Sequence, residues 1–389
     1  CGGIIGPWLK KRIPRAALLG TVAGIGFIWM ATQGVFDILG DPMIGLPVLF
    51  VAILGLFGGY MFPKQIPPLV IAIVGGIVYA LCLGRIQPDF SGIGFYIPNP
   101  VNSIEHLIDG FAIVAPYLTI IIPVEIYNFI ETLDNVEASN AAGDNYNVRE
   151  AQFADGICTM LSALCGGVIP NTVWLGHAGL KKSEAGIGYS LISGIVLGLS
   201  GIFGLFTFLN SVVPPAVCAI TFLWCAVVMV AQAFKDNDRK HYAAIAVAMV
   251  PPVADYLYTQ VTGALSLANL QTAVQNSGLN EYAADITQMI KDAGVMWNGV
   301  PATKSGAIII GILLGTMVTF VIDKRLDKVG ITALMGYILS CFGFIHSASL
   351  GFYPLSPFAI GYLIIAVLSF IFHAGRNTWF KGPDDFDYV

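Results

Sequence analysis

The sequence predicts an all-α, polytopic membrane protein, and three observations support this fold class. Of 389 residues, 56% are hydrophobic and only 11% are charged, which is too few charges to cover a soluble protein of this size. The apolar residues come in runs of roughly 17 to 25, the length that crosses a hydrocarbon core of about 30 Å. The basic residues fall between these runs, mostly in alternate connections, as in polytopic membrane proteins.

The apolar runs give about twelve membrane segments. In chain order they cover residues 16–34, 43–61, 66–84, 111–135, 151–169, 172–184, 186–208, 213–232, 241–262, 305–323, 331–348 and 356–373. The sixth segment is too short and too polar for an ordinary span. The residues before the first segment have the composition of the tail of an earlier span followed by a basic loop. We therefore expect the chain to be N-terminally incomplete.

The basic residues also orient the chain. If the first loop is cytoplasmic and the sides alternate, 16 of the 19 Lys and Arg residues are cytoplasmic. This bias predicts a multi-pass protein of the cell membrane with a cytoplasmic C-terminus. It supports counting residues 172–184 as a crossing, because the basic loops 235–241 and 323–328 would otherwise lie outside. Two long outer connections follow, 85–110 and 263–304, the second with one or two short amphipathic helices.

The fourth segment carries a stripe of polar side chains: Glu125, Asn128, Glu131, Thr132 and Asn135. Their spacing gathers them on one face of a helix. A bare carboxylate in hydrocarbon costs about 3 kcal/mol on insertion scales, so this face should meet protein or water. A plainer alternative is that acids near the helix end meet water and the asparagines bond between helices. For Glu125, Asn128 and Glu131 we expect a binding role, because three polar groups on one face are costly for packing alone.

Residues 165–182, with the sequence CGGVIPNTVWLGHAGLKK, interrupt the apolar pattern. Pro170 removes a backbone donor and disfavours helix in the residue before it. Backbone that leaves the helix at membrane depth is tolerated where it is buried in protein or lines a cavity. Such broken helices form substrate sites in secondary transporters. We therefore expect Asn171 and Thr172 to face a ligand, with a helix restarting near Val173.

His177 is expected one to two turns into that restarted helix, where it can titrate near neutral pH. A lone histidine is more often a packing residue, so a direct role stands beside that plainer interpretation. An intramembrane hydrolase that uses His177 with a carboxylate is a third class of function. The sequence contains no HExxH, Walker or GxSxG motif and no metal-ligand spacing among its five histidines. We therefore expect a protein that is not an enzyme and needs no cofactor or metal.

Four stretches carry a resemblance to a known family: NFIETLDNVEASNAAGD, ADGICTMLSALCGG, IPNTVWLGHAGL and GYSLISG. Together they resemble the nucleobase–ascorbate transporters, also called nucleobase:cation symporter 2 or xanthine/uracil permeases. Within this family the chain is most similar to a bacterial branch related to the hypoxanthine/adenine/guanine-type permeases. The resemblance covers roughly residues 1–325, and PNT after a Gly-rich turn is its most specific part.

The resemblance implies an architecture of fourteen spans in two inverted seven-span repeats, divided into core and gate domains and usually assembled as a homodimer. In each repeat, the third span is broken by a short strand, and the two breaks meet at the substrate. Residues 1–110 would form the C-terminal part of the first repeat, about spans four to seven, and residues 111–325 the second repeat. Residues 326–389 would add two further spans and a cytoplasmic tail. Residues 166–184 match the break of the second repeat, and residues 111–135 match the eighth family span.

The resemblance also implies site residues. Asn128 falls near the position where many relatives have a base-binding carboxylate, and Glu131 falls near a second acid. Relatives often carry a glutamate a few residues past the strand, where this chain has LGH. Because an Asn side chain does not exchange a proton, proton coupling is expected at Glu125, Glu131 or His177. The expected substrate-binding residues are Asn128, Glu125, Glu131, Thr132, Asn171, Thr172 and His177.

The function predicted from the sequence is a secondary active transporter that imports a nucleobase or similar planar heterocycle with a proton or another cation. An alternative of the same architecture carries a small anion or organic acid, because helix N-termini bind anions without a base-specific side chain. The expected partners are the nucleobase-like substrate, the coupling cation, the lipid bilayer and a second copy of the chain. No nucleic acid is expected.

Overall fold

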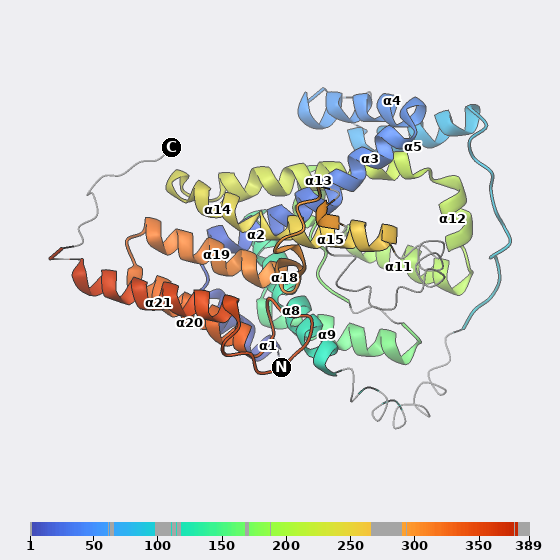
Figure 1. Ribbon diagram of the computed structural model, residues 1–389. Helices are drawn as coiled ribbons and strands as arrows, with labels where there is room; N and C mark the ends of the chain where they lie inside the picture. The colour runs from blue at the N-terminus through green and yellow to red at the C-terminus, as the bar shows by residue number, and fades with distance from the viewer. Residues whose placement is uncertain are drawn as a thin grey trace. The chain divides into compact units, whose positions relative to one another are not determined.

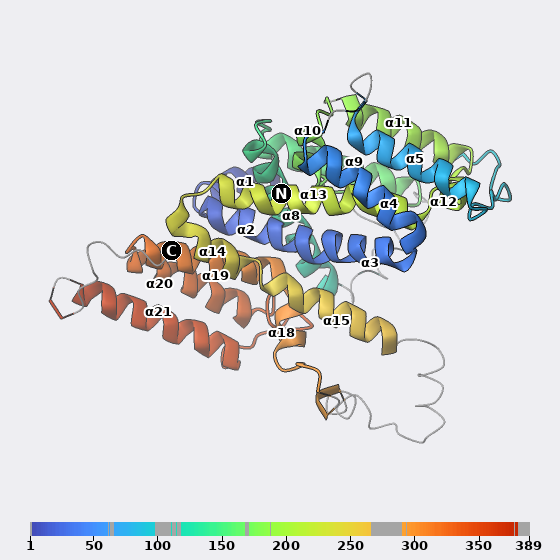
Figure 2. The same ribbon diagram turned by 90° about the horizontal axis from the view of Figure 1, so that it is seen from above.

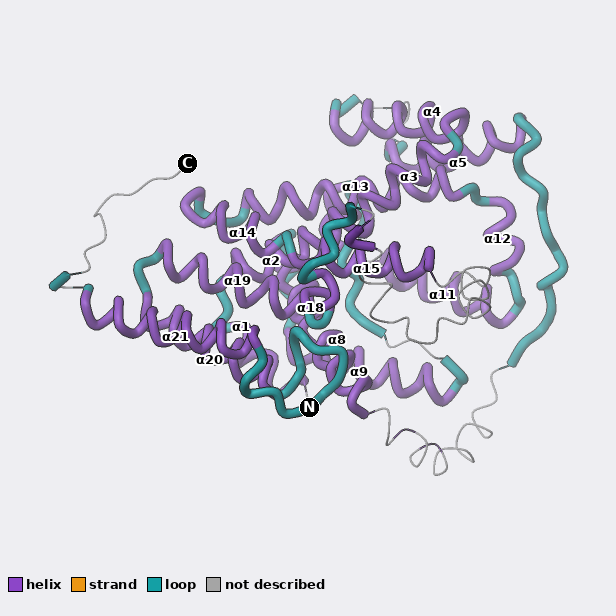
Figure 3. The backbone as a smooth tube through the Cα atoms, in the orientation of Figure 1, coloured by secondary structure: helices purple, strands orange, loops and turns teal. Residues whose placement is uncertain are grey.

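The computed structural model describes residues 2–60, 62, 66–97, 110, 114, 118–167, 171–186, 188–265, 290–292, 294–376 and 378–379. Within these residues every regular element is a helix, and no strand occurs (Figure 3). The chain forms two compact units, each built from separated stretches of sequence. Unit 1 contains residues 1–24, 113–134 and 233–389, and unit 2 contains residues 25–112 and 135–232.

The described part of unit 1 consists of helices joined by turns and loops. Its helices are α1 Gly2–Lys10, α2 Arg15–Ile25, the first part of α8 Leu118–Ala141, α14 Tyr242–Ala248, α15 Pro251–Leu265, α18 Val300–Lys304, α19 Ala307–Ile322, α20 Leu326–Cys341 and α21 Pro357–Gly375. α20 and α21 form a hairpin and lie side by side in both views (Figures 1 and 2). A Cβ at Gly336 of α20 would lie 2.8 Å from the ring of Tyr362 on α21, so glycine makes room for that ring.

Small residues hold α14 against α2 and α19. Both α2 and α19 carry a GxxxG pattern, at Gly20 and Gly24 in α2 and at Gly311 and Gly315 in α19. A Cβ at Gly20 or Gly315 would lie 2.9 Å from the Cβ of Ala248, closer than side chains pack. The glycines therefore allow the three backbones to approach closely, as small residues do between helices in membranes.

Unit 2 contains the helices that surround the break predicted after residue 165. They are α3 Thr32–Gly40, α4 Pro42–Ala52, α5 Pro68–Cys82, α9 Val148–Leu164, α10 His177–Lys182, α11 Gly188–Ile202, α12 Phe206–Val212 and α13 Pro215–Lys235. Apolar residues of α3, α4, α5 and α13 form one buried cluster, which includes Ile38, Val48, Ala80, Val217 and Ile220. This cluster anchors α13, the helix on which α10 packs.

Among the described residues, three helices are long and apolar enough to cross a membrane: Arg15–Gly40, α13 and α21. In the first of these, a π-helical segment, Gly26–Ala31, joins α2 to α3. α11 and α12 would make a fourth span, bent by 113°. Shorter apolar helices cover Pro42–Phe57, Pro68–Cys82 and Ala307–Ile322. The helices agree with a polytopic membrane protein, and the number of about twelve spans stays a prediction.

The predicted span 241–262 is broken in the structure. α14 ends at Ala248 and α15 begins at Pro251. Pro251 and Pro252 have no N–H to extend the helix hydrogen bonds of α14, and proline is well suited to the first turn of a new helix. The break lies near the middle of the predicted span.

Glycines with positive φ interrupt two other predicted spans. Gly204, with φ of +64°, separates α11 from α12 within residues 186–208. Gly343, with φ of +75°, follows the end of α20 within residues 331–348. Glycine adopts this conformation at little cost, so both helices end earlier than predicted.

Most of the outer connection 263–304 and the end of the C-terminal tail lie outside the described residues. At the end of that connection, Val300–Lys304 forms α18. The amphipathic helices expected elsewhere in the connection therefore stay a prediction.

Candidate functional site

The chain leaves the helix between α9 and α10, where the sequence predicts a break. Gly166 has φ of +90° just after α9 ends. Residues 168–170 lie outside the described residues, and residues 171–176 have no regular secondary structure and form no strand. The next helix, α10, begins at His177 rather than near Val173. His177 is therefore the first residue of this helix and not one to two turns into it.

A buried amide explains the late restart. Asn135, on α8, is only 2% exposed, and its Nδ2 donates to the carbonyl oxygen of Val173 at 2.7 Å. A half-buried carbonyl such as that of Val173, once it has left the helix, needs a hydrogen-bond partner. The Asn135 side chain supplies this partner, so the backbone stays irregular past Val173.

Asn171 is fixed to the middle of α9. Its N–H donates to Oγ1 of Thr159 at 2.9 Å, and its Nδ2 donates to Oδ1 of the buried Asp155 at 3.3 Å. Thr159 lies about 16 Å along the helix axis from Val148, roughly half of a 30 Å hydrocarbon core. The half-buried Thr172 follows directly. The break therefore meets polar groups of α9 well inside that helix.

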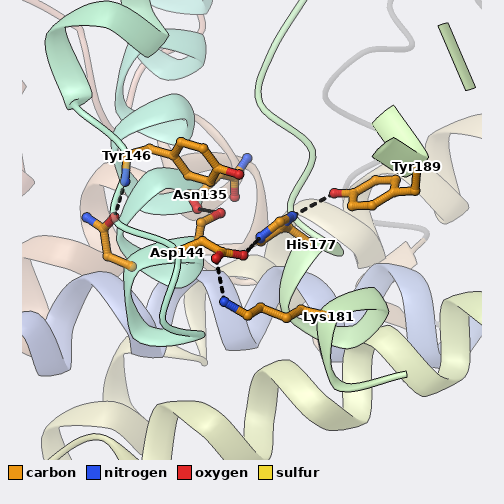
Figure 4. Close-up of polar contacts among 8 residues, drawn as sticks. Asn135, Asp144, Tyr146, His177, Lys181 and Tyr189 are labelled. Carbon is orange, nitrogen blue, oxygen red and sulfur yellow. Dashed lines mark hydrogen bonds and ion pairs between the residues drawn. The ribbon is translucent and has the colours of Figure 1, made fainter. Parts of the chain in front are cut away.

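His177 lies at the centre of a four-residue cluster with Asp144, Lys181 and Tyr189, called the His177 cluster below (Figure 4). Its Nε2 lies 2.8 Å from Oδ2 of Asp144, and its Nδ1 lies 2.6 Å from the hydroxyl of Tyr189. Nζ of Lys181 donates to the other oxygen of Asp144. His177 and Lys181 are one turn apart on α10, so the carboxylate is held between them.

These contacts define which ring nitrogen of the neutral His177 imidazole carries the hydrogen. An ionised carboxylate only accepts hydrogen bonds, so Nε2 carries the hydrogen and donates to Asp144. Nδ1 then accepts from the hydroxyl of Tyr189. Both ring nitrogens of His177 are thus hydrogen-bonded, one as a donor and one as an acceptor.

The charges of the cluster are balanced. Hydrogen bonds from Lys181 and His177 lower the pKa of Asp144 below its ordinary value of 3.8. The side chains of Asp144 and Lys181 are 35% and 34% exposed, whereas that of His177 is 10% exposed. The cluster is thus neutral when His177 is neutral and carries one positive charge when the ring is protonated. Asp144 and Lys181 are thus partly exposed to solvent, whereas the imidazole ring of His177 is largely buried.

α10 is seated closely on α13. A Cβ at Gly179 would lie 2.6 Å from Cα of Cys225. Nε1 of Trp224 donates to the carbonyl oxygen of Gly179 at 3.0 Å and to Oγ of Ser183 at 2.6 Å. A helix this short has little stability of its own, so these contacts are what hold His177 in place.

The predicted polar stripe on residues 125–135 is divided between the two units. Asn135 belongs to unit 2 and contacts the break. Glu125, Asn128, Glu131 and Thr132 belong to unit 1. On α8, Glu125 is exposed, Asn128 and Glu131 are half-buried, and Thr132 is 2% exposed. A common site formed by these four residues and the break stays a prediction.

Sequence reasoning missed three residues of this region: Asp144, Asp155 and Tyr189. The spacing of His177 and Lys181, four residues apart on a helix, was a usable signal, because two such groups on one face call for an acidic partner. Asp155 stands about one turn into the apolar run 151–169, which marks a carboxylate with a partner. Nothing in the sequence singles out Tyr189.

The comparisons with known proteins identify the family. The chain matches the model described as the Permease family, that of the xanthine/uracil permeases, over residues 6–250, well over half of its length. A search of curated proteins and a search of solved structures found no match. The matched region contains both the break and the His177 cluster, and a permease family points to a transporter rather than an enzyme. The chain therefore belongs to the xanthine/uracil permease family, the nucleobase–ascorbate transporters that its motifs resemble, whose members carry small molecules across membranes.

Proposed function

We propose that the protein imports a nucleobase or a similar planar heterocycle together with a proton, by alternating access. The observation that carries this proposal is the irregular segment 171–176, whose first residue is fixed to the middle of α9. Broken helices near the middle of the membrane form the substrate sites of many secondary transporters. The family of the chain supports the choice of a nucleobase as the substrate.

The break offers hydrogen-bonding groups that suit the edge of a nucleobase. Nδ2 of Asn171 is used by Asp155, so its carbonyl oxygen is the atom able to accept an N–H of the base. The hydroxyl of Thr172 both donates and accepts. From the polar stripe of α8, the proposal adds Asn128 and Thr132 as neutral contacts. Glu125 and Glu131 are its acidic contacts.

The His177 cluster suits proton coupling. One proton changes its charge by one unit, and Asp144 lies beside the ring to stabilise the imidazolium. The contact between Asp144 and Lys181 agrees with the charge-based topology, which puts both on the cytoplasmic side. A proton at His177 would thus be exchanged near the cytoplasmic end of the pathway. Glu125 and Glu131 are the other coupling candidates.

The proposed architecture follows the family. It comprises residues 1–110 as part of a first inverted repeat, residues 111–325 as the second repeat and residues 326–389 as two added spans, in a homodimer with cytoplasmic C-termini. The closer relation to hypoxanthine/adenine/guanine-type permeases belongs to the same proposal.

A carrier of small anions or organic acids is the alternative. An anion site needs a cation or donors that are not already neutralised. Lys181, the cation that lies closest in sequence to the break, is paired with Asp144. This pairing favours the nucleobase proposal.

Uptake measurements test the proposal. Labelled uracil, xanthine, guanine and adenine are offered to cells that lack their own nucleobase carriers and express the complete reading frame. We expect saturable uptake of at least one base, lost in Asn128→Ala and Thr172→Ala. Asn210→Ala, at an exposed position on α12, is the matched control and should transport normally. Uptake of no base by a correctly inserted protein would overturn the substrate class, and normal uptake by both site variants would overturn the site.

A further inference from the structure

A second carboxylate lies beside a helix break, in unit 1. α14 ends at Ala248 and α15 begins at Pro251, near the middle of the predicted span 241–262. Asp255 follows one turn after Pro251 and is half-buried. It interacts electrostatically with Lys304 of α18. Because ionisable groups at this depth are costly, those that occur in transporters mark ion or proton pathways.

Aromatic residues hold Lys304 in place. Its Nζ lies 4.9 Å from the ring centre of Tyr258, which is three residues after Asp255 on the same face of α15. Tyr258 stacks on the buried Trp297, with ring centres 5.6 Å apart and planes at 13°. In the part of the chain that the structure describes, no hydrogen bond joins Asp255 to Lys304. The ammonium of Lys304 therefore acts on the carboxylate of Asp255 through space.

Lys304 dominates the electrostatic surroundings of Asp255. The helices packed on α15 within unit 1 are α18 and α19. Their sequences, VPATK and AIIIGILLGTMVTFVI, contain a single charged residue, Lys304. The other titratable residues of α15 are the tyrosines Tyr256 and Tyr258. One proton on Asp255 thus changes the local charge from zero to plus one.

We propose that Asp255 binds and releases a proton during transport, and that Lys304 sets the pH at which it does so. The inference rests on the proposed proton-coupled function and adds to it a proton site in unit 1. When Asp255 is ionised, it neutralises Lys304. When a proton from water binds a carboxylate oxygen, the ammonium keeps its contact with Tyr258, and no other bond changes.

Infrared difference spectra of the reconstituted protein between neutral and acidic pH test proton binding without any substrate. Among the protonated-carboxyl bands that the acidic residues give, we expect one component in the wild type that is missing in Asp255→Asn. In Lys304→Gln the same band should form at higher pH, because the ammonium no longer favours the carboxylate. Asp41→Asn, in the turn between α3 and α4, is the matched control and should keep the band. A full wild-type band in Asp255→Asn would overturn the proposal.

Two transport modes test the role in coupling. Asp255→Asn should still exchange substrate between the two sides of a vesicle at equal pH, because exchange needs no net proton movement. Its gradient-driven accumulation should fall by about an order of magnitude. Undiminished accumulation would overturn the proposal, and so would loss of exchange together with an unaltered pH profile in Lys304→Gln. If the wild type exchanges no base, the proposed function fails. The infrared result still decides whether Asp255 binds a proton.

Discussion

Nε2 of His177 lies 2.8 Å from Asp144, and Lys181, one turn later on α10, donates to the same carboxylate. One acidic side chain therefore ties the connection after α8 to the short helix that follows the break (Figure 4). The His177 cluster thus fixes the start of α10 against that connection.

His177→Gln should remove the pH dependence of uptake. A glutamine amide still donates to Asp144 but takes up no proton, so we expect a flattened profile between about pH 5 and pH 8. Substrate affinity at neutral pH should stay within a few-fold of wild type. Initial uptake rates measured across pH check this expectation. Glu125→Gln and Glu131→Gln are the comparison variants, and a flat profile in one of these with a normal profile in His177→Gln would move the coupling to α8.

Asp144→Asn should lower thermal stability at neutral pH. Lys181 and His177 lower the pKa of Asp144, so the stability that its ionised form contributes is fully present above its ordinary value of 3.8. This contribution is lost as the pH falls through the lowered pKa of the folded protein. In detergent, the melting temperature of Asp144→Asn should therefore be lower than that of the wild type near neutral pH. This difference should disappear in strong acid. A difference in melting temperature that grows as the pH falls would contradict this prediction.

Gly179→Ala should disrupt the packing of α10 on α13. The new Cβ would lie 2.6 Å from the backbone of Cys225, and overpacking of this kind costs about 1–3 kcal/mol. We expect a lower melting temperature and reduced uptake. The matched control is Gly198→Ala on α11, where a Cβ meets nothing within 4 Å and alanine favours the helix. Equal melting temperatures for the two variants would disprove close packing at Gly179.

Asn135→Ala should destabilise the break. The carbonyl of Val173 would lose its 2.7 Å hydrogen bond in a partly buried place, at a cost of about 1–3 kcal/mol. Thermal melting and uptake should both fall, whereas Asn210→Ala on α12 should leave them unchanged. Melting of Asn135→Ala at the wild-type temperature would show that the bond does not hold the segment.

The break after α9 and the long apolar helices α13 and α21 could be predicted from sequence, because proline, glycine and apolar run length act locally. The break at Ala248–Pro251 was missed. An apolar window of membrane length hides a two-residue interruption, even though two prolines mark it.

Contacts between residues far apart in the chain are harder to predict from the sequence than helix breaks. Asp144 and His177 are 33 residues apart in the chain, and Asn135 and Val173 are 38 apart. No spacing rule joins residues so far apart, because their contact depends on how whole helices pack. The predicted start of α10 near Val173 was wrong for the same reason, because the actual start at His177 depends on the hydrogen bond between Asn135 and Val173.

The most direct test of the account is proton-gradient-driven uptake of the labelled base panel, with Thr172→Ala and His177→Gln beside the wild type. The account predicts saturable uptake of one base that stops when the gradient is collapsed. It also predicts loss of uptake in Thr172→Ala and uptake independent of pH in His177→Gln. Uptake of a base that ignores both the gradient and these two substitutions would contradict it.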